Sequence, residues 1–178
     1  MNFISNFNWR PTLSGIALSL LLATGCAQRH NTLSEQEIAD GWELLFDGKT
    51  LDAWKDYNGD SLTMPWRAVD GCIQAHGDGS DLSGYIVTRK QYENFILDWD
   101  WKLSYGGNSG MLYHVLEDPY FKVPYVTGPE YQLIDNAGWE ETNAPTKLEP
   151  WQRLGVDYAM HLPDAAKMRL NPQGEWNN

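Results

Sequence analysis

The side chains best suited to chemistry gather in one stretch of the sequence, residues 106–135. Some of them can exchange a proton or bind a cation, and others carry amide or hydroxyl groups that can hydrogen-bond a sugar. The first group is His114, Glu130 and Asp135, and the second is Asn108, Ser109 and Gln132. A set of this kind can serve acid–base catalysis, metal ligation or recognition of a polar ligand.

The residues between these groups predict two strands joined by a loop. A Gly-Gly turn opens the stretch, an apolar–polar alternation follows over 111–115, and a second strand is expected over 130–135. Side chains alternate across a strand, so Glu130 and Gln132 share one face and can act together. Asp135 falls on the other face and joins them only if a bulge or a strand end intervenes.

The composition indicates one folded domain that does not bind nucleic acid. Thirteen basic residues stand against twenty-four acidic ones in 178 residues, a formal charge of -11. Neutralising phosphates needs clustered Lys and Arg, which this balance does not supply. Nine Trp and 13% aromatic residues exceed what a small core requires. Aromatic rings can stack on the apolar face of a pyranose, although they can also fill a β-sheet core.

The N-terminal residues resemble a bacterial lipoprotein signal. A short apolar run over 15–22 is followed by small residues and then Cys26. This pattern predicts a signal peptide over 1–25, lipidation at Cys26, a tether over 26–33 and a domain over 34–178. The residue after the cysteine is not Asp, which indicates the outer membrane of the cell envelope. Because Cys26 would carry lipid, only Cys72 remains and no intrachain disulfide is expected.

The patterning of the remaining chain is that of an all-β domain. Ser34 and Glu37 have capping-box spacing, so a helix of about two turns should end near Gly41. From residue 95 to 103 every odd position is apolar, the clearest strand pattern in the sequence. No comparable helical period follows residue 41, and turn signals recur often, which favours a β-sandwich or barrel. Further strands are expected over 42–46, 66–69, 72–75 and 85–88.

The last forty residues are less regular. Residues 138–151 are polar with two prolines and predict a surface loop, and 156–160 predict a short strand or turn. The final Gly174-Glu175-Trp176-Asn177 segment is typical of the approach to another strand. We therefore expect a sandwich that is C-terminally truncated, with its last strands beyond Asn178.

Five blocks of the sequence, taken in order, resemble the 3-keto-disaccharide hydrolase domain family. They are residues 41–51 with Trp54, 92–103, 107–115, 129–135 and 174–177. The resemblance implies a concanavalin A-like, jelly-roll β-sandwich of the lectin and glucanase type, with sugar bound in a concave face. It also implies an exported protein of a glycan-degrading bacterium that hydrolyses glycosidic bonds in 3-keto-glycosides.

That activity implies a specific set of groups. A ketone at C3 acidifies the hydrogen on C2, so the C1 substituent can leave by β-elimination and water can add afterwards. The reaction needs a base near C2, a donor for the leaving oxygen and polar contacts to the enolate oxygen. We expect His114, Glu130 and Asp135 to supply acid and base, and Asn108, Ser109, Tyr113 and Gln132 to bind the substrate.

Other interpretations stay open from the sequence alone. A non-catalytic carbohydrate-binding lipoprotein would use the same fold, groove and aromatic residues. A conventional retaining glycosidase is disfavoured, because Asp98-Trp99-Asp100 lacks the glutamates that β-glucanases of this fold carry on one strand. His114 could be structural, and Asn108-Ser109-Gly110 could be a turn. No organic cofactor is expected, and the scattered His, Glu and Asp residues leave a divalent metal open.

Overall fold

The computed structural model describes residues 30–63, 65–75 and 84–178. The predicted signal peptide and the lipidation site Cys26 lie outside the described residues. No helix in the described part of the chain is long and apolar enough to cross a membrane.

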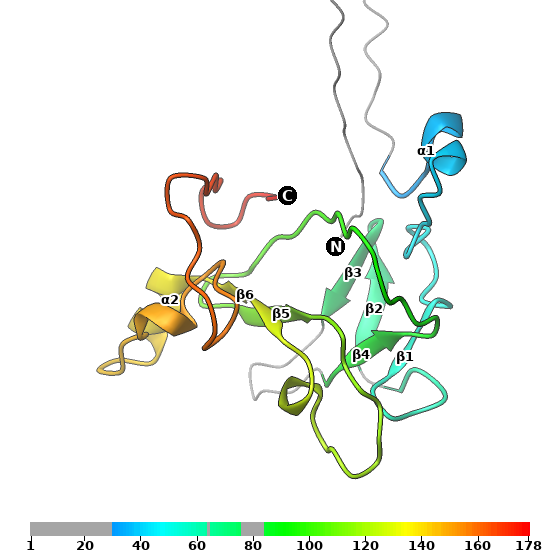
Figure 1. Cartoon of the computed structure of the whole chain (residues 1–178). Helices are drawn as coiled ribbons and strands as arrows, with labels where there is room; N and C mark the ends of the chain where they lie inside the picture. The colour runs from blue at the N-terminus through cyan, green and yellow to red at the C-terminus, as the bar shows by residue number, and fades with distance from the viewer. Residues whose placement is uncertain (1–29, 64, 76–83) are drawn as a thin grey trace, which may run out of the picture.

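The strands of the described residues pair into three antiparallel two-stranded sheets (Figure 1). Each sheet is an antiparallel ladder of three to five residue pairs. The pairs are β1 (Trp54–Asp56) with β4 (Ile86–Thr88), β2 (Trp66–Val69) with β3 (Cys72–Ala75), and β5 (Asn108–Leu112) with β6 (Glu130–Ile134). The strands expected over 66–69, 72–75 and 85–88 are therefore confirmed, the last of them one residue shorter.

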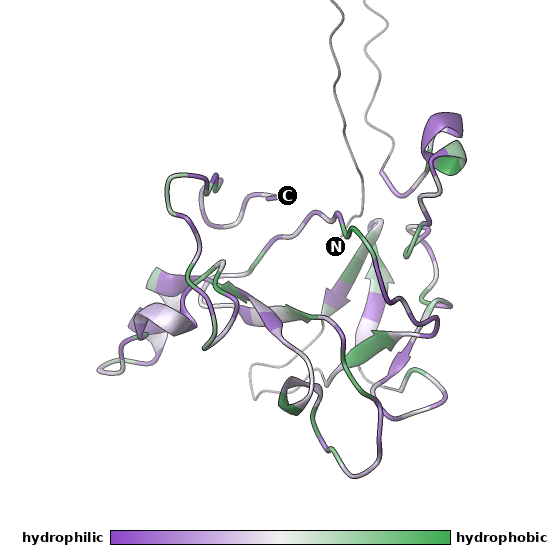
Figure 2. Ribbon diagram, viewed as in Figure 1, coloured by the Kyte–Doolittle hydropathy of each residue, from purple (hydrophilic) through white to green (hydrophobic). Residues whose placement is uncertain are grey.

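Two short α-helices and two 3₁₀ turns complete the described structure: α1 (Glu35–Ala39), η1 (Pro124–Val126), α2 (Asn136–Thr142) and η2 (Pro150–Gln152). The capping box is present, since Glu37 N–H donates to Ser34 Oγ and Ser34 N–H donates to the Glu37 carboxylate. The surface loop predicted over 138–151 is wrong in part, because α2 occupies its first residues. The residues of α2 are mostly hydrophilic (Figure 2), so a search for apolar periodicity did not detect this helix.

One hydrophobic cluster of the described residues contacts strands of all three sheets. Phe46, Trp54 and Ile73 are buried together, and Met111 of β5 packs against them with other partly buried apolar residues. The Trp54 indole N–H donates to the Leu45 carbonyl at 2.8 Å, which satisfies its polar atom inside the core. Faces of strands from all three sheets thus pack on one interior. The all-β sandwich class is confirmed.

Residues 95–103 are not a strand, in contrast to their sequence pattern. Their only ladder contact among the described residues is an isolated bridge between Trp101 and Asn177. The alternation of burial holds over most of the segment, since Leu97 and Trp99 pack against the core, Trp101 is 6% exposed, and Ile96, at an even position, is 80% exposed. Phe95 departs from it with an exposed fraction of 42%. A periodic pattern reports which side chains can be buried, whereas a strand also requires a hydrogen-bonded neighbour. For the same reason, residues 42–46 bury Phe46 without forming the strand expected there.

Residues 156–158, which follow η2, pair with β6 and extend the β5–β6 sheet on that side. Gln132 N–H donates to the Val156 carbonyl at 2.9 Å, and Tyr158 N–H donates to the Glu130 carbonyl at 2.8 Å. Tyr131 and Asp157 form the antiparallel bridge between these bonds. Residues 130 and 158 are therefore directly opposed. The side chains of such a pair lie on the same face of the sheet, with Cβ atoms roughly 5 Å apart.

Asp135 closes the end of this sheet. Its Oδ2 accepts from Gly106 N–H at 2.9 Å, its Oδ1 accepts from Gly138 N–H at 3.3 Å at the start of α2, and its own N–H donates to the Gly107 carbonyl at 2.9 Å. Gly106 has a positive φ of 65°, a conformation that glycine adopts without strain. One carboxylate therefore joins the turn before β5 to the helix after β6.

We expect Asp135→Ala to lower the free energy of unfolding by about 1–2 kcal/mol, because it removes a helix cap and a turn contact together. Asp135→Asn keeps one acceptor oxygen and should lose less. Urea unfolding followed by tryptophan fluorescence measures both changes. Equal stability of wild type and Asp135→Ala would show that the contacts do not hold the sheet end.

Candidate active site

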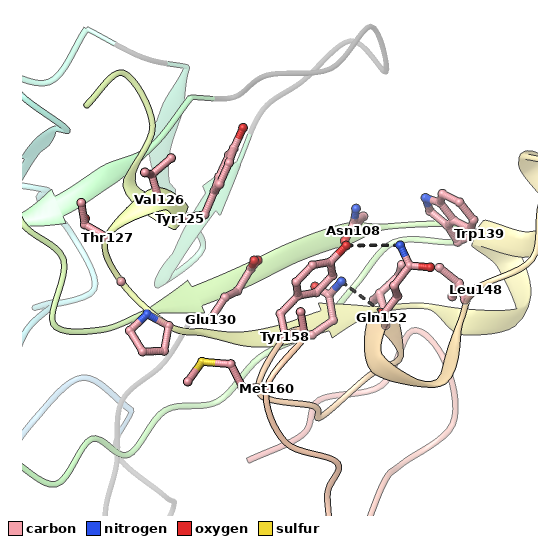
Figure 3. A pocket seen from close by; sticks show the side chains of 15 residues that line it. Asn108, Tyr125, Val126, Thr127, Glu130, Trp139, Leu148, Gln152, Tyr158 and Met160 are labelled. Atoms are coloured by element: carbon pink, nitrogen blue, oxygen red, sulfur yellow. Dashed lines mark hydrogen bonds between the residues drawn. The ribbon is translucent and has the colours of Figure 1, made fainter. Parts of the chain in front are cut away.

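A cavity of about 720 Å³ opens over one face of the β5–β6 sheet (Figure 3). Such a volume lies in the usual range for small-molecule sites. The sheet supplies Asn108, Glu130, Gln132 and Ile134, and the surrounding segments supply Tyr125, Val126, Trp139, Leu148, Gln152, Tyr158 and Met160. The wall is thus a mixture of aromatic, apolar and neutral polar groups with one carboxylate, a composition that suits a sugar.

The register of β5 and β6 decides which side chains reach the cavity. Leu112 is opposite Glu130, and Asn108 is opposite Ile134, so these positions share one face. Leu133, on the other face, is 1% exposed in the interior. The prediction that Glu130 and Gln132 lie together is confirmed by the cavity lining.

Glu130 is the only charged side chain among the described residues that line the cavity. It is half-buried, and this burial raises the pKa of its carboxyl above the ordinary value of 4.5. The side chain extends over Gly110, where an added Cβ would collide with Oε1 and lie 2.6 Å from Cδ. No hydrogen bond or ion pair holds the carboxylate within the described part of the chain. It is therefore available to a ligand.

Gln132 lies beside Glu130 in the cavity lining, and only the nitrogen of its side-chain amide is hydrogen-bonded in the described residues. Its Nε2 donates to the Gln152 carbonyl at 3.2 Å, while Oε1 is buried and has no partner in the described residues. The residue is 4% exposed. A backbone carbonyl can only accept, so the amide orientation is fixed and the oxygen is the unpaired atom. A buried acceptor without a donor is costly, which points to a group that binds there.

Gln152 and Tyr158 complete the polar wall, and the sequence analysis did not single them out. Gln152 Nε2 donates to the Tyr158 hydroxyl at 3.2 Å (Figure 3), and Gln152 Oε1 accepts from Glu149 N–H at 3.0 Å. Gln152 is the last residue of η2 and Tyr158 lies in a turn, and no periodic pattern in the sequence marks either position. The nearest signal was the expected strand or turn over 156–160, which carries Tyr158 and is confirmed as one bridge followed by a turn.

An ion pair holds the segment that carries Gln152. Glu140 of α2 binds Arg153 at 2.7 Å and Lys147 at 3.0 Å, and it accepts from Leu148 N–H at 3.2 Å. These bonds, that of Lys147 first, lower the pKa of the Glu140 carboxyl. Glu140 therefore anchors the loop that follows α2 to the helix.

Four predicted site residues do not line this cavity. His114 is exposed with a positive φ of 52°, and its ring lies 5.6 Å from Phe95 and 5.9 Å from Tyr113. Ser109 is paired with Leu133 and shares its opposite face. Asp135 has the capping role described above. The structure therefore brings Asn108, Glu130 and Gln132 together but separates them from His114, Ser109, Tyr113 and Asp135.

Tyr113 belongs to a second polar group. Its hydroxyl donates to Asp157 Oδ1 at 3.3 Å, and Asp157 Oδ2 contacts His161 Nδ1 at 2.9 Å. Burial first, and then the Asp157 charge, raise the pKa of Tyr113. No three His, Cys, Asp or Glu side chains are grouped to hold a metal ion within residues 30–63, 65–75 and 84–178.

Comparison with known proteins places the chain. A family of domains described as 3-keto-alpha-glucoside-1,2-lyase-like matches residues 41–178. The chain belongs to this family. The match includes β1 to β6 and every segment that lines the cavity, so the cavity lies within the part of the chain that the family description covers.

Two relatives extend this result. A 3-keto-disaccharide hydrolase of Bacteroides thetaiotaomicron is 32% identical over 152 residues, which is 78% of this chain and 51% of that protein. The crystal structure of a Parabacteroides distasonis protein, provisionally described as a glycosyl hydrolase, is 46% identical with a TM-score of 0.70. It covers 82% of this chain and 65% of its own. The chain thus spans about half the length of the curated relative and is similar to proteins that act on glycosides.

The raised pKa of Glu130 predicts a pH-dependent stability. The folded chain keeps this proton to a higher pH than the unfolded chain, so the free energy of unfolding falls as pH rises from 4.5 through the raised pKa. Glu130→Gln cannot ionise. We expect it to gain stability relative to wild type at pH 7 but not at pH 4, measured by urea unfolding.

The exposed Glu93→Gln is the matched control, since it removes a carboxylate that the protein does not bury. It should show the same small difference from wild type at both pH values. A Glu130→Gln difference that does not change with pH would contradict burial as the cause of the raised pKa.

Proposed function

We propose that this domain cleaves the glycosidic bond of 3-keto-glycosides by β-elimination and hydration, with Glu130 as the base. The observation that carries this proposal is the Glu130 carboxylate, which has a raised pKa and no hydrogen-bond or ion-pair partner among the described residues, in a cavity whose other described residues are neutral. A base is most effective when its pKa approaches the working pH, and burial moves Glu130 in that direction. The lyase chemistry in the family description supports the same route.

The reaction balances with one sugar, one water and the carboxylate. Glu130 takes the proton from C2, and the C2–H electrons move toward the C3 ketone to form an enolate. The enolate then expels the C1 oxygen substituent, which takes the proton held by Glu130 and leaves as an alcohol. The carboxylate and the C3 ketone are restored, and a C1–C2 double bond remains. Water adds its oxygen to C1 and a proton to C2. The products are a 3-keto-sugar and the alcohol.

The lining of the cavity fits a neutral glycoside. It contains no Lys or Arg among its described residues, so it offers no counter-charge to a phosphate or carboxylate substrate. Trp139 and Tyr125 present rings that can cover the apolar face of a pyranose. Asn108 and the unpaired oxygen of Gln132 can hydrogen-bond its hydroxyl groups.

Glu130 is favoured over the other acid–base candidates by position. Both carboxylate oxygens of Asp135 accept hydrogen bonds from backbone N–H groups at the end of the sheet. His114 lies outside the cavity lining, against the rings of Phe95 and Tyr113. The Glu130 carboxylate, in contrast, faces the cavity over Gly110.

The test is turnover of p-nitrophenyl 3-keto-α-glucoside compared with its unoxidised parent. We expect cleavage of the keto sugar alone, since only the ketone acidifies C2. Glu130→Gln should lower kcat by roughly 100-fold or more. Gly110→Ala keeps the carboxylate but displaces it, and it should also lower kcat.

His114→Gln is the comparison variant. If it abolishes turnover while Glu130→Gln does not, the base is His114 and the assignment made here is wrong. If the wild-type protein binds the keto sugar and cleaves neither compound, the domain is a carbohydrate-binding module and the enzymatic proposal fails.

We further propose that the protein is lipid-anchored in the bacterial cell envelope, at the outer membrane. The support is the N-terminal sequence alone, with its short apolar run and small residues before Cys26. Cys26→Ala should abolish incorporation of labelled palmitate and release the protein from the membrane fraction. A Cys72→Ala control should keep both properties. Unchanged labelling in Cys26→Ala would contradict the anchor.

A further inference from the structure

We infer that the Tyr158 hydroxyl donates the hydrogen bond that recognises the ketone oxygen, and that Gln152 sets its direction. This inference rests on the proposed function and adds to it the group that stabilises the enolate. Tyr158 and Gln152 both line the cavity.

The direction of the hydrogen bonds follows from groups that can play only one role. Glu149 N–H can only donate, so the Gln152 atom that it binds at 3.0 Å is the amide oxygen. The other end of the amide is then NH₂, and it donates to the Tyr158 hydroxyl at 3.2 Å. The phenol oxygen is therefore an acceptor in this contact. Its own hydrogen remains to be donated elsewhere.

Because Tyr158 lines the cavity, this hydroxyl hydrogen can be donated to a ligand bound there. Residues 130 and 158 are opposed across the antiparallel backbone contact, with Tyr158 N–H bound to the Glu130 carbonyl at 2.8 Å. Their side chains share the cavity face. In a 3-keto-sugar, the C2 hydrogen and the C3 oxygen are held on adjacent carbons. A base and a donor that act on these two sites must come from neighbouring positions, and Glu130 with Tyr158 is such a pair.

The chemical contribution is specific to the transition state. As Glu130 removes the C2 proton, negative charge grows on the ketone oxygen, and a positioned O–H donor becomes a stronger partner for it. The Gln152 NH₂ group donates a hydrogen bond to the Tyr158 hydroxyl oxygen, and this polarises the phenol so that its O–H becomes a stronger donor. An unoxidised sugar has a hydroxyl at C3 and develops no such charge.

The Tyr158 ring has a separate role. It packs edge-on against Trp151, with centroids 5.3 Å apart and an interplanar angle of 84°. Tyr158→Phe keeps this packing and removes only the hydroxyl. Gln152→Glu keeps the shape and the Glu149 contact, but its second oxygen can only accept, so it would draw the Tyr158 hydrogen away from the cavity.

The experiment measures affinity by calorimetry and kcat with p-nitrophenyl 3-keto-α-glucoside and its parent. We expect Tyr158→Phe and Gln152→Glu to lower kcat with the keto sugar by roughly 100-fold and its affinity by roughly tenfold. Binding of the parent sugar should change by less than about twofold. Tyr120→Phe, at an 83% exposed residue outside the cavity lining, is the matched control and should leave both compounds unaffected.

Equal losses for keto and parent sugars, or no loss, would overturn the role of Tyr158 while wild-type turnover still supports the proposed function. If the wild type cleaves nothing but Tyr158→Phe selectively weakens keto-sugar binding, the recognition role stands and the enzymatic proposal fails. Absence of any binding by the wild-type protein would overturn both.

Discussion

The antiparallel register between β5 and β6 is the constraint on which the site depends. It places Glu130 and Gln132 on the cavity face and Leu133 in the interior. A shift of one residue would exchange the two faces, burying the carboxylate and exposing the leucine, so register is strongly specified here. The Asp135 carboxylate fixes the end of the pair. Asp135, which the sequence predicted as an acid–base residue, therefore helps to position Glu130, the carboxylate that faces the cavity.

The same register explains why glycine stands at position 110. In the strand it lies opposite Gln132 and diagonally beside Glu130, and the Glu130 side chain lies across it. A glycine in a strand interior weakens the strand, because it has no side chain to pack. Here the missing Cβ makes room for a carboxylate that would otherwise be displaced. A small loss in strand stability thus allows a defined position for the one charged side chain among the described cavity residues.

Local patterns in the sequence predicted the parts of the fold that local forces determine. The sequence correctly predicted three such features. They are the Ser34–Glu37 capping box, the two strands of the 66–75 hairpin, whose turn residues Asp70 and Gly71 are left-handed, and the common face of Glu130 and Gln132. Residues 95–103 were misread because alternation does not supply a neighbouring strand. Tyr158 and Gln152 were missed because tertiary contacts position them: the Glu140–Arg153 ion pair holds one segment, and backbone bonds to β6 hold the other.

The electrostatics of the cavity connect binding to chemistry. The protein carries a formal charge of -11, yet the described cavity lining contributes a single carboxylate and no cation. The pKa of Glu130 is consequently raised by burial and not lowered by a partner. A bound sugar would replace water around the carboxylate and increase that burial, which raises the pKa further and makes the group a stronger base. The 3-keto-glycoside that we propose as the substrate would also bring an acidic C–H to it. In a cavity built this way, binding of the proposed substrate would itself activate the proposed base. A nearby Lys or Arg would have opposed that activation by stabilising the ionised carboxylate.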